Sequence, residues 1–108
     1  MKVKFKNGVV KSCTAPTEQK VFRNVDGVMV GVGWLLNFRI TGGMTSDEVD
    51  NVLTLDNITS LEFLAETENG EDKTIFVLDG YDKITSSVIR HTEDTTSTSV
   101  EIQLSKGI

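Results

Sequence analysis

Few side chains in this sequence could act as an acid, a base or a nucleophile. His91 is the only histidine and Cys13 the only cysteine among 108 residues. A catalytic base needs an oriented nucleophile and an orienting partner, and no such arrangement is evident around His91. We interpret His91 as an exposed residue at a strand end and Cys13 as an inert, buried or half-buried thiol. The sequence therefore predicts a protein that is not an enzyme and has no catalytic residues.

Two patterns could bind an ion, but each lacks the context that binding needs. Acidic residues gather in one stretch, at Glu66, Glu68, Glu71 and Asp72. Their spacing is not that of a calcium-binding EF-hand loop, so we interpret them as a solvated hairpin tip. Gly31 and Gly33 form a Gly-x-Gly without the third glycine and the following helix of a phosphate-binding motif. We expect no metal, no cofactor and no small-molecule substrate.

Lysines and aromatic residues supply the remaining candidate surface. Lysines alternate with apolar residues at the start of the chain, and Trp34 and Phe38 share one face of a predicted strand because side chains alternate along it. If that face is exposed, it marks a contact surface. The candidate contact residues are Lys2, Lys4, Lys6, Trp34 and Phe38. We expect the other central aromatics, Phe5, Phe63 and Phe76, to lie in the core.

Turn residues divide the chain into short strands. Asn or Asp precedes Gly at Asn7-Gly8, Asp26-Gly27, Asn69-Gly70 and Asp79-Gly80. Two-residue hairpins need positive φ angles, which these residues tolerate, so most of the pairs predict hairpin turns. Alternating or β-branched residues predict strands over 2–6, 9–14, 21–25, 28–40, 61–65, 74–78, 84–89 and 100–104. Within 28–40, Gly31 and Gly33 indicate a bulge or bend.

One segment favours a helix. Thr45 and Glu48 have the spacing of a capping box, and Val49, Val52 and Leu53 then form one apolar stripe. Residues 92–99 contain no apolar side chain and predict an exposed loop. Residues 1–108 thus predict one mainly β (α+β) domain, an antiparallel sandwich or open barrel of about seven strands with one short helix near 46–54.

Charge is distributed unevenly along the sequence. Residues 1–23 carry a net charge of +5 and the remaining residues −10, for a total of −5. One interpretation is a lysine-rich edge hairpin that resists strand-to-strand aggregation. The other is that opposite faces of the subunit carry opposite charge, which would favour head-to-tail association. The net acidity argues against nucleic acid as a partner.

Nothing in the sequence predicts export or membrane insertion. The first residues lack the continuous apolar region of a signal peptide. The longest mainly apolar stretch, 28–40, is too short to span a bilayer. We expect the protein to reside in the cytoplasm of the producing cell and to have no membrane partner.

The order of several segments resembles a known group of proteins. They are the opening Met1-Lys2-Val3-Lys4-Phe5-Lys6-Asn7-Gly8, the segment 44–53 (MTSDEVDNVL), the segment 58–63 (ITSLEF) with its hairpin Glu68-Asn69-Gly70, and Tyr81 before a β-rich close. This arrangement, over about half of the chain, resembles small structural proteins encoded in the tail modules of phages and prophages of Gram-positive bacteria. The resemblance implies a non-enzymatic virion or assembly subunit that binds its own copies or other virion proteins. It carries over no site residue.

The alternative function is a small binding module of the oligonucleotide-binding β-barrel type. Its support is the order of strands around the short helix, and the acidic composition argues against it. The two functions differ in one structural feature. A binding module should bring Lys2, Lys4, Lys6, Lys11, Trp34 and Phe38 together on one concave face.

Overall fold

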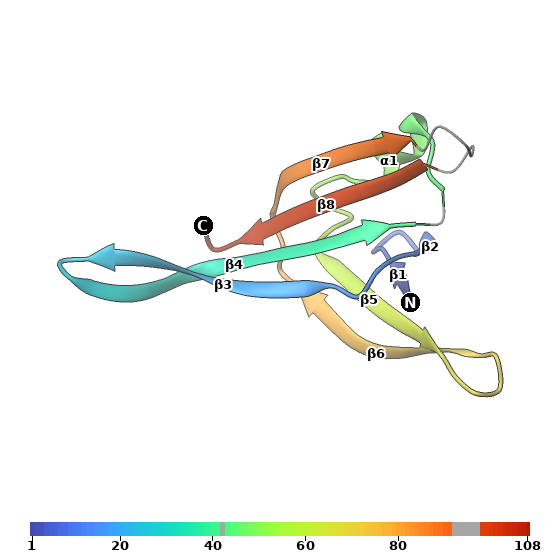
Figure 1. Ribbon diagram of the computed structural model, residues 1–108, viewed down its shortest axis with the longest axis horizontal. Coiled ribbons are helices and arrows are strands. Elements are labelled where there is room, and N and C mark those ends of the chain that lie inside the picture. Colours follow the sequence, from blue (N-terminus) through green and yellow to red (C-terminus); the bar gives the residue numbers. More distant parts are fainter. Residues whose placement is uncertain (42, 92–97) are drawn as a thin grey trace.

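The computed structural model describes residues 1–41, 43–91 and 98–108 and consists of two packed antiparallel sheets (Figure 1). The first sheet has the order β2-β1-β5-β6, with strands Val10–Ser12, Lys2–Lys4, Ser60–Glu66 and Asp72–Asp79. The second has the order β3-β4-β8-β7, with strands Thr17–Val25, Val28–Ile40, Thr98–Lys106 and Lys83–His91. The single helix of the described residues, α1, spans Ser46–Val52. The predicted mainly β sandwich with one short helix is confirmed, and the described residues form eight strands.

Three of the four Asx-Gly pairs lie in hairpin turns, as predicted. Asp26 (φ 51°) and Gly27 (φ 84°) join β3 to β4 directly, because Val25 pairs with Val28. Positive φ at both central residues is the type I′ geometry that suits the twist of a hairpin. The pairs at 7–8 and 69–70 lie in the β1–β2 and β5–β6 hairpins. The pair at 79–80 instead leads from β6 in one sheet to β7 in the other.

The core fills the space between the sheets. Phe38 of β4 meets Phe63 of β5 edge to face, with ring centroids 5.5 Å apart, so this pair joins the two layers. The fully buried Tyr81 donates a hydrogen bond from its hydroxyl to Glu18 at 2.6 Å. Burial and this hydrogen bond both raise the pKa of Tyr81. The predicted core position of Phe76 is wrong, because Phe76 lies on an edge strand and stacks on Phe63 while remaining exposed.

Helix α1 begins where its capping residues predict. The Thr45 side chain accepts a hydrogen bond from the backbone N–H of Glu48 at 3.2 Å. Val49 and Val52 are buried against the core, while Leu53 is partly buried beside them. The helix is shorter than the predicted 46–54 because the chain leaves helical geometry at Leu53 (φ −87°, ψ 67°).

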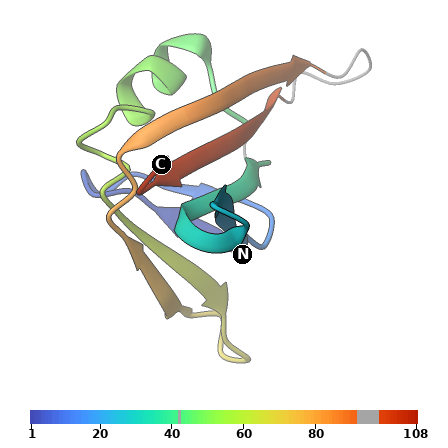
Figure 2. The ribbon, with the colours of Figure 1, turned by 90° about the vertical axis from the view of Figure 1, so that its left-hand side faces the viewer.

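Strands β3 and β4 extend well beyond the rest of their sheet (Figure 1). Their connecting turn faces the viewer in Figure 2. β4 pairs with β8 only from Trp34 to Ile40, whereas its pairing with β3 continues to the turn. We call the two-stranded part beyond β8, residues 21–33, the arm. Val21 and Phe22 pair with Gly33 and Gly31, so Val32 is an extra residue and the predicted bulge is confirmed.

Candidate interaction surface

The arm concentrates exposed apolar side chains. Six of the large hydrophobic side chains that remain exposed lie on it or at its base: Phe22, Val25, Val28, Met29, Val30 and Trp34. Val28 and Met29, next to the turn, are 63% and 61% exposed. Contiguous exposed apolar surface is uncommon on soluble monomers and marks sites of interaction. The arm is therefore the strongest candidate site in the described part of the chain.

The inner face of the arm continues the core face of its sheet. Trp34 has the same orientation along β4 as Leu36, Phe38 and Ile40, which are all buried. Phe22 and Met29 lie on this same face, because Lys20 pairs with Trp34, Phe22 with Gly31 and Asn24 with Met29. Among the residues that the structure describes, no strand of the other sheet extends over the arm (Figure 1). The inner face is consequently a stretch of core-type surface without its second layer.

Lys20 covers part of this inner face. Its ammonium nitrogen lies 5.7 Å from the centroid of the Trp34 ring and 5.9 Å from that of Phe22. These distances allow cation–π attraction, which is worth about 0.5–1 kcal/mol at exposed sites. The lysine stem also crosses Gly31, where an added Cβ would lie 2.5 Å from the Lys20 Cε. A small residue at position 31 thus lets Lys20 reach both rings.

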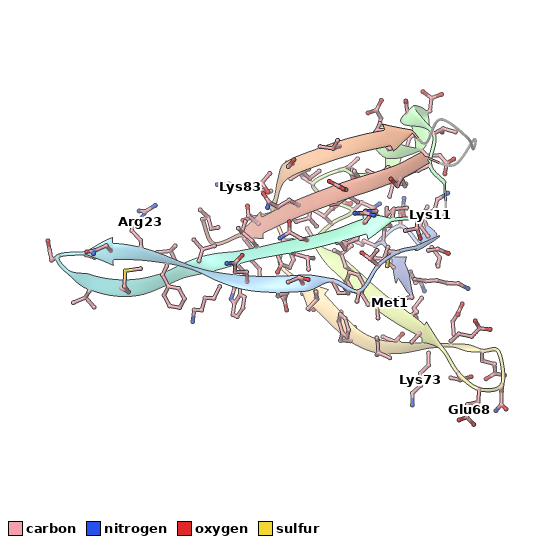
Figure 3. The ribbon with its side chains drawn as sticks, in the orientation of Figure 1. Met1, Lys11, Arg23, Glu68, Lys73 and Lys83 are labelled. Atoms are coloured by element: carbon pink, nitrogen blue, oxygen red, sulfur yellow. The ribbon has the colours of Figure 1, made fainter. Side chains whose placement is uncertain are left out.

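The outer face of the arm is apolar as well. Val25, Val28 and Val30 share this face with Arg23, and all three valines are exposed. Figure 3 shows the Arg23 side chain projecting outward from the ribbon of the arm. A strand with one buried face normally alternates apolar and polar residues, and the arm departs from this pattern by carrying exposed apolar residues on both faces.

A second apolar group lies on the edge strand β6. Ile75, Phe76 and Val77 are exposed there. Phe76 and Leu78 also line a shallow pocket together with Pro16 and Glu18, at the start of β3. The pocket shows that β3 and β6 lie at the same edge of the sandwich. This apolar group, which we call the β6 edge, lies apart from the arm within one chain (Figure 1).

The N-terminal lysines pair with acidic residues from distant parts of the chain. Lys2 binds Asp72 at 2.9 Å, Lys6 binds Asp56 at 3.3 Å, and Lys11 binds Glu48. The hydrogen bond with Asp72 raises the pKa of Lys2. The hydrogen bond from Lys11 lowers the pKa of Glu48. The charge asymmetry of the sequence is therefore partly neutralised within the folded chain.

The structure does not bring the predicted contact residues together. Lys2 and Lys4 lie on β1 in one sheet, and Trp34 lies at the base of the arm in the other. Phe38 is only 5% exposed because its ring packs against Phe63. Its place in a contact surface is corrected to the core. The concave face that would characterise an oligonucleotide-binding module is not formed by these residues.

The candidate reactive residues lie apart from the arm. Cys13 is buried, and burial raises the pKa of its thiol to about 11, which disfavours the reactive thiolate. The side chain of His91 and the predicted loop residues 92–97 lie outside the described residues, while positions 98 and 99 belong to β8. In the part of the chain that the structure describes, no group of His, Cys, Asp and Glu side chains could hold a metal ion. No helix there has the length and apolarity that crossing a bilayer requires.

Comparison with known proteins gave no family model, curated protein or solved structure that matches this chain. The arm itself was not predicted as a contact surface. Its signal in the sequence was the pair of apolar runs on either side of Asp26-Gly27, where apolar residues occupy neighbouring positions and would face both sides of a strand.

Proposed function

We propose that the protein is a non-enzymatic structural subunit that acts through protein–protein contacts, in virions or in the assembly of phage or prophage tails. The observation that carries the proposal is the arm, which presents apolar residues on both faces beyond the sandwich. The resemblance of residues 1–8, 44–53 and 58–63 to tail-module proteins supports the phage setting. Before assembly, such a subunit resides in the cytoplasm of the producing cell.

The arm suits contact with another protein for an energetic reason. An isolated two-stranded hairpin is at best marginally stable in water, and this one holds large apolar side chains in solvent. Covering apolar surface contributes roughly 25 cal/mol per Å². A protein partner that covers both faces would therefore stabilise the arm and bind through it. Because the N-terminal lysines are paired within the chain, apolar burial rather than charge supplies the attraction.

The first test measures molar mass by light scattering over a wide range of protein concentrations. We expect assembly that grows with concentration and is not weakened by added salt, since salt screens charges but not apolar contacts. Val28→Asp and Met29→Asp should shift the mass towards the monomer. Leu55→Asp is the matched control, because Leu55 is similarly exposed at 59% but lies outside the arm. Arm variants that assemble like Leu55→Asp would contradict the proposal.

A further inference from the structure

β3 presents a regular free edge along its whole length. It is the outermost strand of its sheet and spans nine residues, Thr17–Val25. The bulge leaves this edge uninterrupted, because the extra residue Val32 belongs to β4. Edge strands expose unpaired N–H and C=O groups that can pair with another chain, and proteins commonly protect them with proline, charged side chains or a covering segment. β3 contains no proline, and two of its three charged side chains are engaged within the chain: Glu18 accepts a hydrogen bond from Tyr81, and Lys20 lies over the rings of Phe22 and Trp34.

We propose that two copies of this chain associate by antiparallel pairing of their β3 strands about a two-fold axis at Val21. This inference rests on the proposed function and names the partner that covers the inner face of the arm. Val21 is the central residue of β3, so this register uses all nine residues of both strands. The facing pairs across the axis are Thr17 with Val25, Glu18 with Asn24, Gln19 with Arg23, and Lys20 with Phe22. Like charges would not face each other directly, as stable cross-strand pairs require.

The same arrangement covers the two apolar groups that lie apart in one chain. Antiparallel pairing places residues 22–25 of one copy, in its arm, beside residues 17–20 of the other copy. Within 17–20, Glu18 lines a pocket together with Phe76 and Leu78. The two-fold axis leaves the inner faces of the two joined sheets, one from each copy, on the same side. Phe22 and Met29 in the arm of one copy would therefore face the β6 edge of the second copy. The contact thus supplies the missing second layer.

The exposed apolar residues favour a second copy as the occupant, because each chain carries both the apolar arm and the exposed apolar group of β6. An unrelated strand could also add to a free edge, but it would not account for the matching β6 edge. The self-complementarity of β3 and β6 is what identifies the partner as a copy of this chain.

The test is a disulfide across the proposed axis. Facing residues of antiparallel strands have Cα atoms about 4.5–5.5 Å apart, and disulfides link Cα atoms about 4.4–6.8 Å apart. Val21→Cys should therefore form a covalent dimer on mild oxidation, seen on a non-reducing gel. Val88→Cys, on the opposite edge strand β7 of the same sheet, should not. Wild-type protein controls for Cys13, which is buried.

A second variant tests the contact without chemistry. Phe22→Lys places a charge at a side chain that is 52% exposed, so the monomer should keep its fold. We expect at least a tenfold weaker self-association by light scattering, and no change for Val88→Lys, whose residue is 43% exposed. Circular dichroism spectra should match the wild type in both variants.

The outcomes separate this inference from the proposed function. A wild-type chain that is monomeric at every concentration contradicts the β3 pairing, while the structural subunit stands with another virion protein as its partner. If the wild type assembles but Val21→Cys does not cross-link, or Phe22→Lys does not weaken assembly, the β3 pairing is wrong while the structural subunit stands. Cross-linking of Val21→Cys together with weakened assembly of Phe22→Lys supports the inference.

Discussion

Replacement of Gly33 by alanine should destabilise the fold through a backbone collision at the root of the arm. A Cβ at this position would lie 2.2 Å from the carbonyl oxygen of Lys106 and 2.9 Å from the carbonyl carbon of Gly107. Neither atom can move without shifting the end of β8, which pairs with β4 at Trp34 and Lys106. Forcing an extra carbon into such a site costs about 1–3 kcal/mol. The close approach also explains why glycine stands at the point where the arm leaves the sheet.

Gly31→Ala is the matched control within the same strand. Its Cβ would lie 2.5 Å from the Cε of Lys20, which is the far end of a flexible side chain and can turn aside. Alanine also restricts the unfolded chain, which stabilises by about 0.4–1 kcal/mol where the native backbone accepts it. We therefore expect Gly31→Ala to unfold at the wild-type temperature or slightly above it.

The comparison is made by thermal unfolding at one low protein concentration. For a domain of this size, 1 kcal/mol shifts Tm by about 4–8 °C, so Gly33→Ala should melt about 4–24 °C below the wild type. Light scattering at the same concentration shows that the variants are compared in one assembly state. Equal Tm values for Gly31→Ala and Gly33→Ala would refute the argument that the C-terminal segment fixes the root of the arm.

Two further variants test the helix and the buried thiol. Thr45→Ala removes the side chain that caps α1 and should lower the free energy of unfolding by about 1 kcal/mol. The measurement is urea denaturation, with Thr45→Ser as the control that keeps a capping hydroxyl. Equal losses in both variants would show that the cap does not stabilise the fold. The Cys13 pKa of about 11 lies above that of an exposed thiol, so the unfolded state loses this proton first and stability should fall as pH rises from about 9 to 11. Unfolding midpoints over this range should fall less steeply in Cys13→Ala, and parallel curves would show that the thiol does not contribute.

Local patterns predicted most of the strands because each depends on neighbours in the sequence. The Asp26-Gly27 turn, the strand 28–40 with its bulge and the cap at Thr45 all follow from backbone conformations of a few residues. Features that depend on distant segments could not be found this way. The pairing of Lys2 with Asp72 joins residues 70 positions apart, so the charge of the first 23 residues did not indicate a charged face.

Alternation along a strand did not predict which side chains are buried, because burial also depends on distant segments. Trp34 and Phe38 share one face of β4, yet Phe38 is buried and Trp34 is exposed, because the opposing sheet ends between them. Phe76 has the inward orientation of a core residue but lies on the last strand of its sheet. The sequence of a strand specifies which side chains share a face. It does not specify how far the facing sheet extends.

Several features of the arm restrict its conformation, which supports the proposed role in binding. The type I′ turn fixes its end, Lys20 packs across the rings of its inner face, and the C-terminal residues contact Gly33 at its root. None of these features adds to the buried core of the sandwich, which among the described residues contains no residue of the arm. Their common effect is to restrict the conformations of an apolar hairpin in solvent. Such restriction reduces the conformational entropy that the arm would lose on binding. The construction of the arm therefore favours the proposed contact with a partner.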